Sequence, residues 1–172
     1  MSTSAKKMED PKVVLSGTDG HSPVAVSATS SAGGKTRKIV VNRPEKLNSL
    51  NREMVKTLDE TFSSYQKDSN IRCILLEGTG RAFCAGGDVD AIRSAVISGE
   101  SSLPADFFYE EYILNHRISQ GDKSHDTPQI AIWDGFVMGG GVGISAHGKF
   151  RIATERSVGR IQGRRAREPA GR

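Results

Sequence analysis

Two glycine-bearing turns in this sequence have residue types that can stabilise a negative charge. They lie at residues 83–88 (FCAGGD) and residues 138–143 (MGGGVG), each after an apolar run. Glycine has no side chain, so such a turn can present its backbone N–H groups closely to a ligand. Two turns that converge on one point form an oxyanion hole, which stabilises the charge that develops on a carbonyl oxygen. The pair of turns therefore predicts chemistry at a carbonyl group.

The segments that must position these turns alternate between strand and helix patterns. A short apolar strand at 39–41 ends before Pro44, which has no N–H and disfavours a helix at the preceding residue. Residues 51–66 carry apolar side chains on one helical face, with Asn51 as the N-cap. The apolar run at 71–76 suits a strand buried on both faces. Strand, helix and strand in this order predict a parallel α/β unit.

The alternation continues through the second glycine turn. Residues 89–96 predict a short helix with Val89, Ile92, Ala95 and Val96 on its apolar face, and Pro104 opens a longer helix. Further on, the pattern predicts a strand at 130–133, a helix at 140–146 and a last strand at 150–153.

Composition limits the classes of protein to consider. The chain has 172 residues, 36% of them hydrophobic, which is enough for one domain with a modest core. No apolar stretch approaches the roughly 18 residues of a membrane span, so no membrane partner is expected. The two cysteines, Cys73 and Cys84, lack metal-ligand spacing and are expected to stay reduced, as in an intracellular protein. The four histidines are scattered, so neither a metal site nor a catalytic triad is predicted.

The positive charge is confined to the end of the chain. The formal net charge is +4, and residues 159–172, with five arginines and the single carboxylate Glu168, account for all of it. A short arginine tract can bind RNA or another anionic surface. Such binding would be lost on deletion of 159–172 and would weaken steeply with salt. The body of the chain has no net basic character, so no nucleic-acid partner is expected.

One local pattern suggests a dinucleotide site. Residues 141–146 (GVGISA) fit the G-x-G-x-x-A fingerprint and follow a strand. That fingerprint also needs an acidic residue about twenty positions further on, and Glu155 comes too early. No nicotinamide cofactor is therefore predicted.

Taken together, the motifs resemble the enoyl-CoA hydratase/isomerase (crotonase) superfamily. The resemblance rests on RPEKLNSL at 43–50, GRAFCAGGD about thirty residues later, and GFVMGGGVG after a further strand. Within the superfamily, FCAGGD, FFYEEY and MGGGVGISAHGKFRIATE are most similar to the 3-hydroxyisobutyryl-CoA hydrolase group, thioesterases of valine breakdown. The resemblance runs from about Ile39 to Val158. It implies an α/β fold of the crotonase-like ββα spiral type and an acyl-CoA substrate, with coenzyme A present only as part of that substrate and no separate cofactor.

The resemblance also implies roles for individual residues. The backbone N–H groups of Gly87 and Gly140 match the two oxyanion donors, and Glu111 matches a substrate-contacting glutamate. Without the resemblance, the need for tight turns would explain these glycines, and Glu111 would be a solvated charge on the surface of a helix. Weaker substrate-binding candidates, whose family counterparts contact coenzyme A largely through the backbone, are Lys46, Leu47, Ala85 and Asp88.

The sequence departs from the family after residue 158. The hydrolase group carries its catalytic carboxylates in Pro-Glu and Pro-Asp turns beyond the strand that matches 150–153, and no such turns follow here. The hydratases' first catalytic glutamate corresponds to Gly143, which disfavours hydration. We therefore expect a spiral that is incomplete at its C-terminus, in a truncated product of a longer gene. The predicted segments are an irregular N-terminus (1–36), with candidate edge strands at 13–15 and 24–26, a partial crotonase-like domain (37–158) and a disordered basic tail (159–172).

Two functional hypotheses follow. The chain is a 3-hydroxyisobutyryl-CoA hydrolase-like enzyme without the family's catalytic carboxylates, or it is a non-catalytic fragment that binds acyl-CoA or a partner subunit. Homo-oligomerisation is expected if the fold is complete enough. The resemblance implies a mitochondrial or peroxisomal location.

Overall fold

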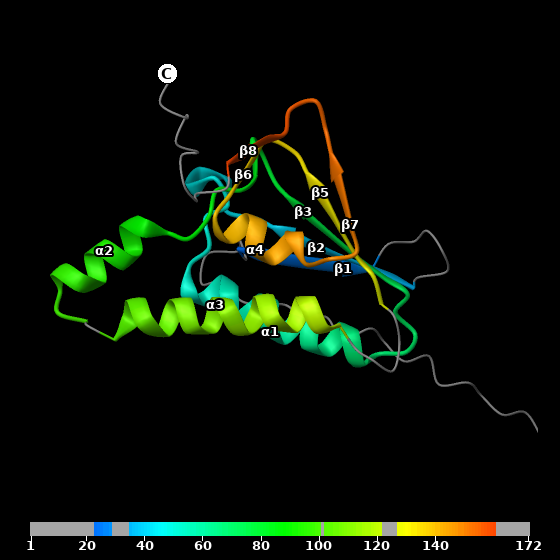
Figure 1. Cartoon of the computed structure of the whole chain (residues 1–172), viewed down its shortest axis with the longest axis horizontal. Coiled ribbons are helices and arrows are strands. Elements are labelled where there is room, and N and C mark those ends of the chain that lie inside the picture. The colour runs from blue at the N-terminus through cyan, green and yellow to red at the C-terminus, as the bar shows by residue number, and fades with distance from the viewer. Residues whose placement is uncertain (1–22, 29–34, 101, 122–126, 161–172) are drawn as a thin grey trace, which may run out of the picture.

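The structure, a computed structural model, describes residues 23–28, 35–100, 102–121 and 127–160 (Figure 1). Its larger sheet has the strand order β1-β2-β3-β5-β7, in which β1 is antiparallel to β2 and the other neighbours are parallel. These strands are Val24–Ala28, Thr36–Val41, Cys73–Gly78, Gln129–Trp133 and Phe150–Ala153.

A second, smaller parallel sheet has the order β4-β6-β8. Its strands are Ala82–Cys84, Phe136–Met138 and Val158–Arg160. Each of them directly follows a strand of the larger sheet, so the chain repeats a strand–strand unit and, after β4 and β6, adds helices. This order confirms the predicted ββα spiral.

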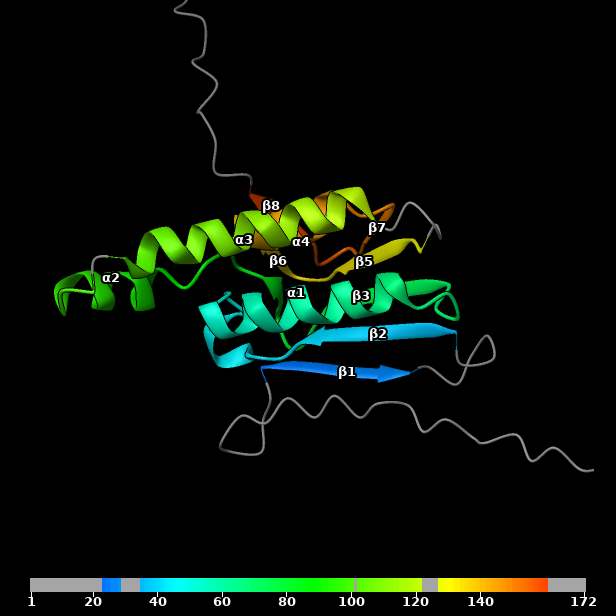
Figure 2. The same cartoon turned by 90° about the horizontal axis from the view of Figure 1, so that it is seen from below.

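Two long helices run side by side against the larger sheet, α1 (Arg52–Lys67) and α3 (Leu103–Gln120), as Figure 2 shows. Two bidentate ion pairs join them, Arg52 to Glu110 and Arg117 to Asp59. The 3-10 turn η2 (Pro44–Lys46) precedes α1. Helix α2 (Val89–Ile97) lies out at one end of the molecule, and the short α4 (Gly140–Ala146) follows β6 (Figure 1).

The core lies between the sheets and these helices. The apolar face predicted for 51–66 is buried, with Met54, Val55, Leu58 and Phe62 almost fully inaccessible to solvent. Asn51 caps α1, and its side-chain oxygen accepts a hydrogen bond from the Met54 N–H at 2.8 Å. The remaining core side chains come mainly from β2, β3, β4, α3 and α4 and include Ile39, Val41, Ile74, Leu76, Phe83, Phe107, Leu114 and Ile144.

The structure corrects several predicted boundaries. The candidate edge strand at 24–26 is confirmed and extends over 24–28, within a segment otherwise expected to be irregular, whereas 13–15 lie outside the described residues. Strands β4 and β6 were predicted only as parts of glycine turns, because three residues are too few to show a period. Strand β8 crosses the boundary at 158/159 and pairs with β6, so the first two residues assigned to the tail are ordered.

The apolar faces are less completely buried than predicted. On α2 only Ala95 is buried, while Val89 and Val96 are 71% and 58% exposed. In β3 only alternate residues, Ile74 and Leu76, are buried, so this strand is fully covered on one face rather than on both. No helix in the described part of the chain is long and apolar enough to cross a membrane.

Candidate functional site

The two glycine turns meet. They follow β4 and β6, which are parallel neighbours and therefore bring the turns to the same edge of the small sheet. A Cβ atom placed on Gly86 would lie 3.4 Å from the Met138 carbonyl oxygen and 3.7 Å from the Gly140 nitrogen. Gly86 and Gly139 both have positive φ values, +105° and +47°, which side chains disfavour. Glycine is thus needed for the backbone conformation of both turns, while a Cβ atom at either position would make ordinary van der Waals contact with the other turn.

The two predicted donors have no acceptor in the described part of the chain. Leu50 pairs with the first turn, since its N–H donates to the Gly86 oxygen at 2.7 Å and its oxygen accepts from the Asp88 N–H at 2.8 Å. This pairing leaves the Gly87 N–H between them without a backbone acceptor. Gly140 is the first residue of α4, so its N–H has no partner inside the helix. Both amides are available to a ligand atom.

Glu111 on α3 lies directly against the second turn. A Cβ atom on Gly140 would lie 2.5 Å from Glu111 Oε1 and 3.1 Å from Leu50 Cδ1. Glu111 is only 7% exposed, and its carboxylate has no hydrogen bond or ion pair with any other described residue. Burial raises the pKa of Glu111 above its ordinary value. The structure thus places Glu111 beside Gly140, where burial disfavours the charged form of its carboxyl group.

Asp88 anchors the first turn with its side chain. Its Oδ1 accepts from the Ala91 N–H at 3.0 Å and caps α2, and its Oδ2 accepts from the Arg43 guanidinium at 2.6 Å. Burial alone would raise the pKa of Asp88, but the bonds from Ala91 and Arg43 together outweigh it and lower the pKa. The side chain is therefore occupied by structural contacts.

The other predicted substrate contacts lie along the neighbouring turn. Leu47 is left-handed, with φ of 52°, and its oxygen accepts from the Ala85 N–H at 3.0 Å, so these two residues are adjacent. Lys46 is exposed, and its Nζ lies 3.7 Å from Asp90 Oδ2. The structure brings Leu47 and Ala85 to the first glycine turn and leaves Lys46 at its solvent side.

Asn48 holds this turn in place and was not predicted from the sequence. It is fully buried and left-handed, with φ of 57°. Its amide nitrogen donates to the Thr79 and Ala82 oxygens at 2.8 and 2.7 Å, and its oxygen accepts from the Arg43 N–H at 2.7 Å. Asparagine tolerates the left-handed region better than most residues, a signal that the LNS sequence already carried.

Apolar side chains also line the site and were not predicted. A Cβ atom on Gly87 would lie 3.2 Å from the ring of Phe107, and a Cβ atom on Gly140 would lie 3.1 Å from Leu50 Cδ1. Beside them lies a cavity of about 240 Å³, whose lining includes Leu50, Asp88, Ile92, Leu103 and Phe107. This mostly apolar cavity therefore shares Leu50, Asp88 and Phe107 with the surroundings of the two glycine turns.

The buried thiol behind the turns is not a nucleophile. Cys84 is fully buried at the end of β4, and its backbone oxygen would clash with a side chain at Gly141. Burial raises its pKa to about 12, so the thiol stays protonated at neutral pH. Among the described residues, no three His, Cys, Asp or Glu side chains gather in a group that could hold a metal ion.

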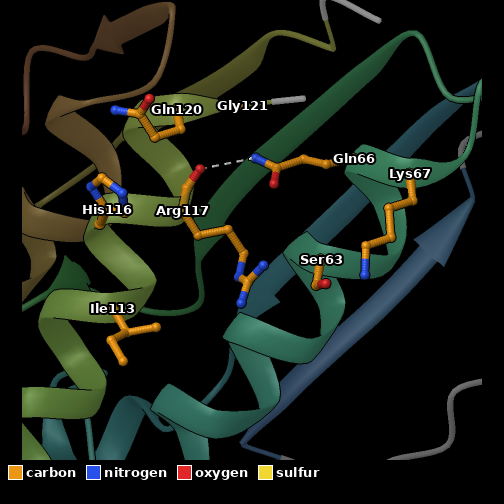
Figure 3. Close-up of a pocket in the computed structure, with 8 residues that line it drawn as sticks. All are labelled: Ser63, Gln66, Lys67, Ile113, His116, Arg117, Gln120 and Gly121. Carbon is orange, nitrogen blue, oxygen red and sulfur yellow. Dashed lines mark hydrogen bonds between the residues drawn. The ribbon is translucent and has the colours of Figure 1, made fainter. Parts of the chain in front are cut away.

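A larger cavity, of about 390 Å³, lies away from the turns between the C-terminal halves of α1 and α3 (Figure 3). Gln66 Nε2 donates to the Arg117 oxygen across it at 3.4 Å. The Arg117 guanidinium is paired with Asp59, and no predicted site residue lines this cavity. The larger cavity is thus separate from the candidate site.

Comparison with known proteins agrees with this geometry. The family model for enoyl-CoA hydratase/isomerase matches residues 36–160. The chain belongs to the enoyl-CoA hydratase/isomerase family. Solved relatives of the same fold include an enoyl-CoA hydratase from Rhodobacter sphaeroides, with a TM-score of 0.73 and 30% identity over 81% of this chain and 40% of that one. A carnitinyl-CoA dehydratase from Mycobacterium thermoresistibile has a TM-score of 0.72 and 36% identity, over 81% of this chain and 38% of that one.

Curated relatives in this family carry hydrolase names. Probable 3-hydroxyisobutyryl-CoA hydrolase 3 of Arabidopsis thaliana is 43% identical over 122 residues, which are 71% of this chain and 31% of the relative. The mitochondrial 3-hydroxyisobutyryl-CoA hydrolase of Rattus norvegicus is 44% identical over 121 residues, 70% of this chain and 30% of the relative. The chain therefore spans about a third of the length of these relatives.

Proposed function

We propose that the chain binds a coenzyme A thioester with its carbonyl oxygen between the Gly87 and Gly140 N–H groups, as part of a 3-hydroxyisobutyryl-CoA hydrolase. The observation that carries this proposal is the contact between the two glycine turns, which leaves two amides without acceptors in the described part of the chain. The hydrolase names of relatives more than 40% identical support the choice of reaction.

In hydrolysis, water attacks the thioester carbon and the carbonyl oxygen takes the negative charge. The two N–H groups stabilise that oxyanion, the carbon–sulfur bond breaks, and free coenzyme A leaves as the hydroxy acid forms. Glu111 contacts the bound acyl group from the side of α3. This division of roles assigns the described part of the chain to binding and oxyanion stabilisation.

The alternative function is binding without turnover. Two carboxyl groups are buried in the described part of the chain, Asp88 and Glu111. Asp88 is occupied by Arg43 and the cap of α2, and Glu111 is the group proposed to contact the acyl chain, so neither is assigned as the base. These observations favour a protein that holds an acyl-CoA, or joins a partner that supplies the base.

Release of free coenzyme A from 3-hydroxyisobutyryl-CoA tests the proposal, with Gly140→Pro and Gly140→Ala as a matched pair. Proline deletes the N–H and is tolerated at the first residue of a helix, whereas alanine adds a Cβ but keeps the N–H. Loss of one oxyanion donor lowers turnover roughly a hundredfold or more, so we expect Gly140→Pro to fall well below Gly140→Ala. Equal rates in the two variants would contradict an oxyanion role for this amide. Thioester binding without turnover in the unmodified chain would establish the alternative.

The compartment is also a proposal. Relatives from rat and other vertebrates are named as mitochondrial proteins, and we infer a mitochondrial site of action for this chain. Fractionation of cells that express the full chain, with mitochondrial and peroxisomal markers, tests it. Co-purification with peroxisomes would contradict the inference.

A further inference from the structure

A second polar side chain of α3 faces α4 beyond Glu111. Asn115 lies one helical turn after Glu111, and Gly143 lies one turn after Gly140. A Cβ atom on Gly143 would lie 2.6 Å from Asn115 Nδ2 and 3.1 Å from its Oδ1. The amide of Asn115 thus occupies the space that a side chain at 143 would take, just as Glu111 does at 140.

Both of these polar groups lack partners. Asn115 Oδ1 is buried and has no hydrogen bond, and the Glu111 carboxylate has none with the described residues. Buried polar atoms are nearly always hydrogen-bonded, and an unpaired one is destabilising. The buried, unpaired Asn115 Oδ1, one turn along α3 from the Glu111 carboxylate, therefore indicates a ligand group that can donate to it.

The spacing suits a hydroxyl group on the substrate. Gly140 and Gly143 are three residues apart, about 4.5 Å along the helix axis. A thioester whose carbonyl oxygen lies at the Gly140 N–H would place a hydroxyl on its third acyl carbon at about this distance. A hydroxyl both donates and accepts, so it can donate to Glu111 or Asn115 Oδ1 and accept from Asn115 Nδ2.

We propose that Asn115 is a specificity-determining residue that, with Glu111, binds the hydroxyl of a hydroxyacyl thioester. The inference rests on the proposed function and adds to it the residue that distinguishes hydroxyacyl from plain acyl groups. A site built to bond a hydroxyl discriminates against the analogue that lacks it, because its polar groups are then left unpaired.

The test compares 3-hydroxyisobutyryl-CoA with isobutyryl-CoA, which differ only in the hydroxyl. Isothermal titration of the full chain gives the ratio of the two dissociation constants. We expect the unmodified chain to prefer the hydroxyacyl thioester and Asn115→Leu to reduce that preference about fivefold, through weaker binding of the hydroxyacyl thioester alone. Gly143→Ala keeps Asn115 but displaces its amide, so the same change in ratio is expected. His116→Leu, an exposed neighbour on α3, is the control and leaves the ratio unchanged.

The outcomes separate the two proposals. If the unmodified chain binds neither thioester, the proposed function is wrong and this inference fails with it. If the chain binds both, but shows no preference, or keeps its preference in both folded variants, only the assignment of Asn115 is wrong. Circular dichroism of each variant establishes that it is folded.

Discussion

Two adjacent glutamates show how environment decides the chemistry of a residue. Glu110 accepts hydrogen bonds from two guanidinium nitrogens of Arg52, Nε and Nη2, and these bonds outweigh partial burial and lower the pKa of Glu110. Glu111 points to the other side of the same helix, against Gly140, where burial raises its pKa. The sequence EE alone cannot make this distinction, because it depends on which face of α3 meets the glycine turns. Only the resemblance to the family pointed to Glu111.

The raised pKa of Glu111 predicts a pH-dependent stability difference. The folded state favours the neutral acid, so the stabilisation is complete below the unfolded pKa, near 4.5, and is lost as the pH rises through the folded value. Glu111→Gln stays neutral at every pH. We therefore expect the variant to unfold at a higher urea concentration than the unmodified chain at pH 7, with the difference shrinking to near zero below about pH 4.5. A difference that does not change with pH would contradict this explanation.

At the scale of elements, the site depends on short turns tied to each other rather than on long helices. Asn48 joins the turn before α1 to the loop after β3 and to the first residue of β4 by two hydrogen bonds from one side-chain amide. Leu50 and Leu47 then pair with the first glycine turn. These contacts hold Gly87 in position relative to Gly140. A substitution of Asn48 would therefore disturb the site even though Asn48 itself does not contact a ligand.

Substitution of Asn48 tests this dependence. Asn48→Ala leaves the Thr79 and Ala82 oxygens unpaired and loses a residue that suits positive φ, so we expect a loss of about 3 kcal/mol in the free energy of unfolding. Asn48→Asp keeps the oxygen that accepts from the Arg43 N–H, but its second oxygen faces the Thr79 and Ala82 carbonyl oxygens with no proton to donate. We therefore expect Asn48→Asp to be at least as destabilising as Asn48→Ala. Asn70→Ala, an exposed asparagine, is the control and changes stability by less than about 0.5 kcal/mol. An Asn48→Asp variant as stable as the unmodified chain would contradict the assigned donors. Urea denaturation measures all three.

At the scale of the whole molecule, the sequence predicted the helices and the strands of the larger sheet well, and the small sheet and the contacts between distant segments poorly. The helix at 51–66, the helix at 140–146 and the strand at 150–153 match α1, α4 and β7 within a residue or two. The small sheet was missed because its three-residue strands are held by pairing with each other, which no local pattern records. For the same reason Asn48 and Asn115 were not found, since each acquires its contacts from a distant segment.

The exposed edge of the larger sheet, at β7, favours self-association of the chain in solution. Strand β7 is an edge in the sheet order, and Phe150 and Ile152 are each 51% exposed. An edge strand with exposed apolar residues and unpaired backbone groups is a template for pairing with another chain. We expect the chain to self-associate as its concentration rises and Ile152→Lys to shift it toward the monomer in analytical ultracentrifugation. The control is Val96→Lys, because Val96 is a similarly exposed apolar residue, 58% exposed, that lies on α2 and not on a sheet edge. Because strand pairing needs a sheet edge while general hydrophobic contact does not, a Val96→Lys effect as large as that of Ile152→Lys would refute association through β7.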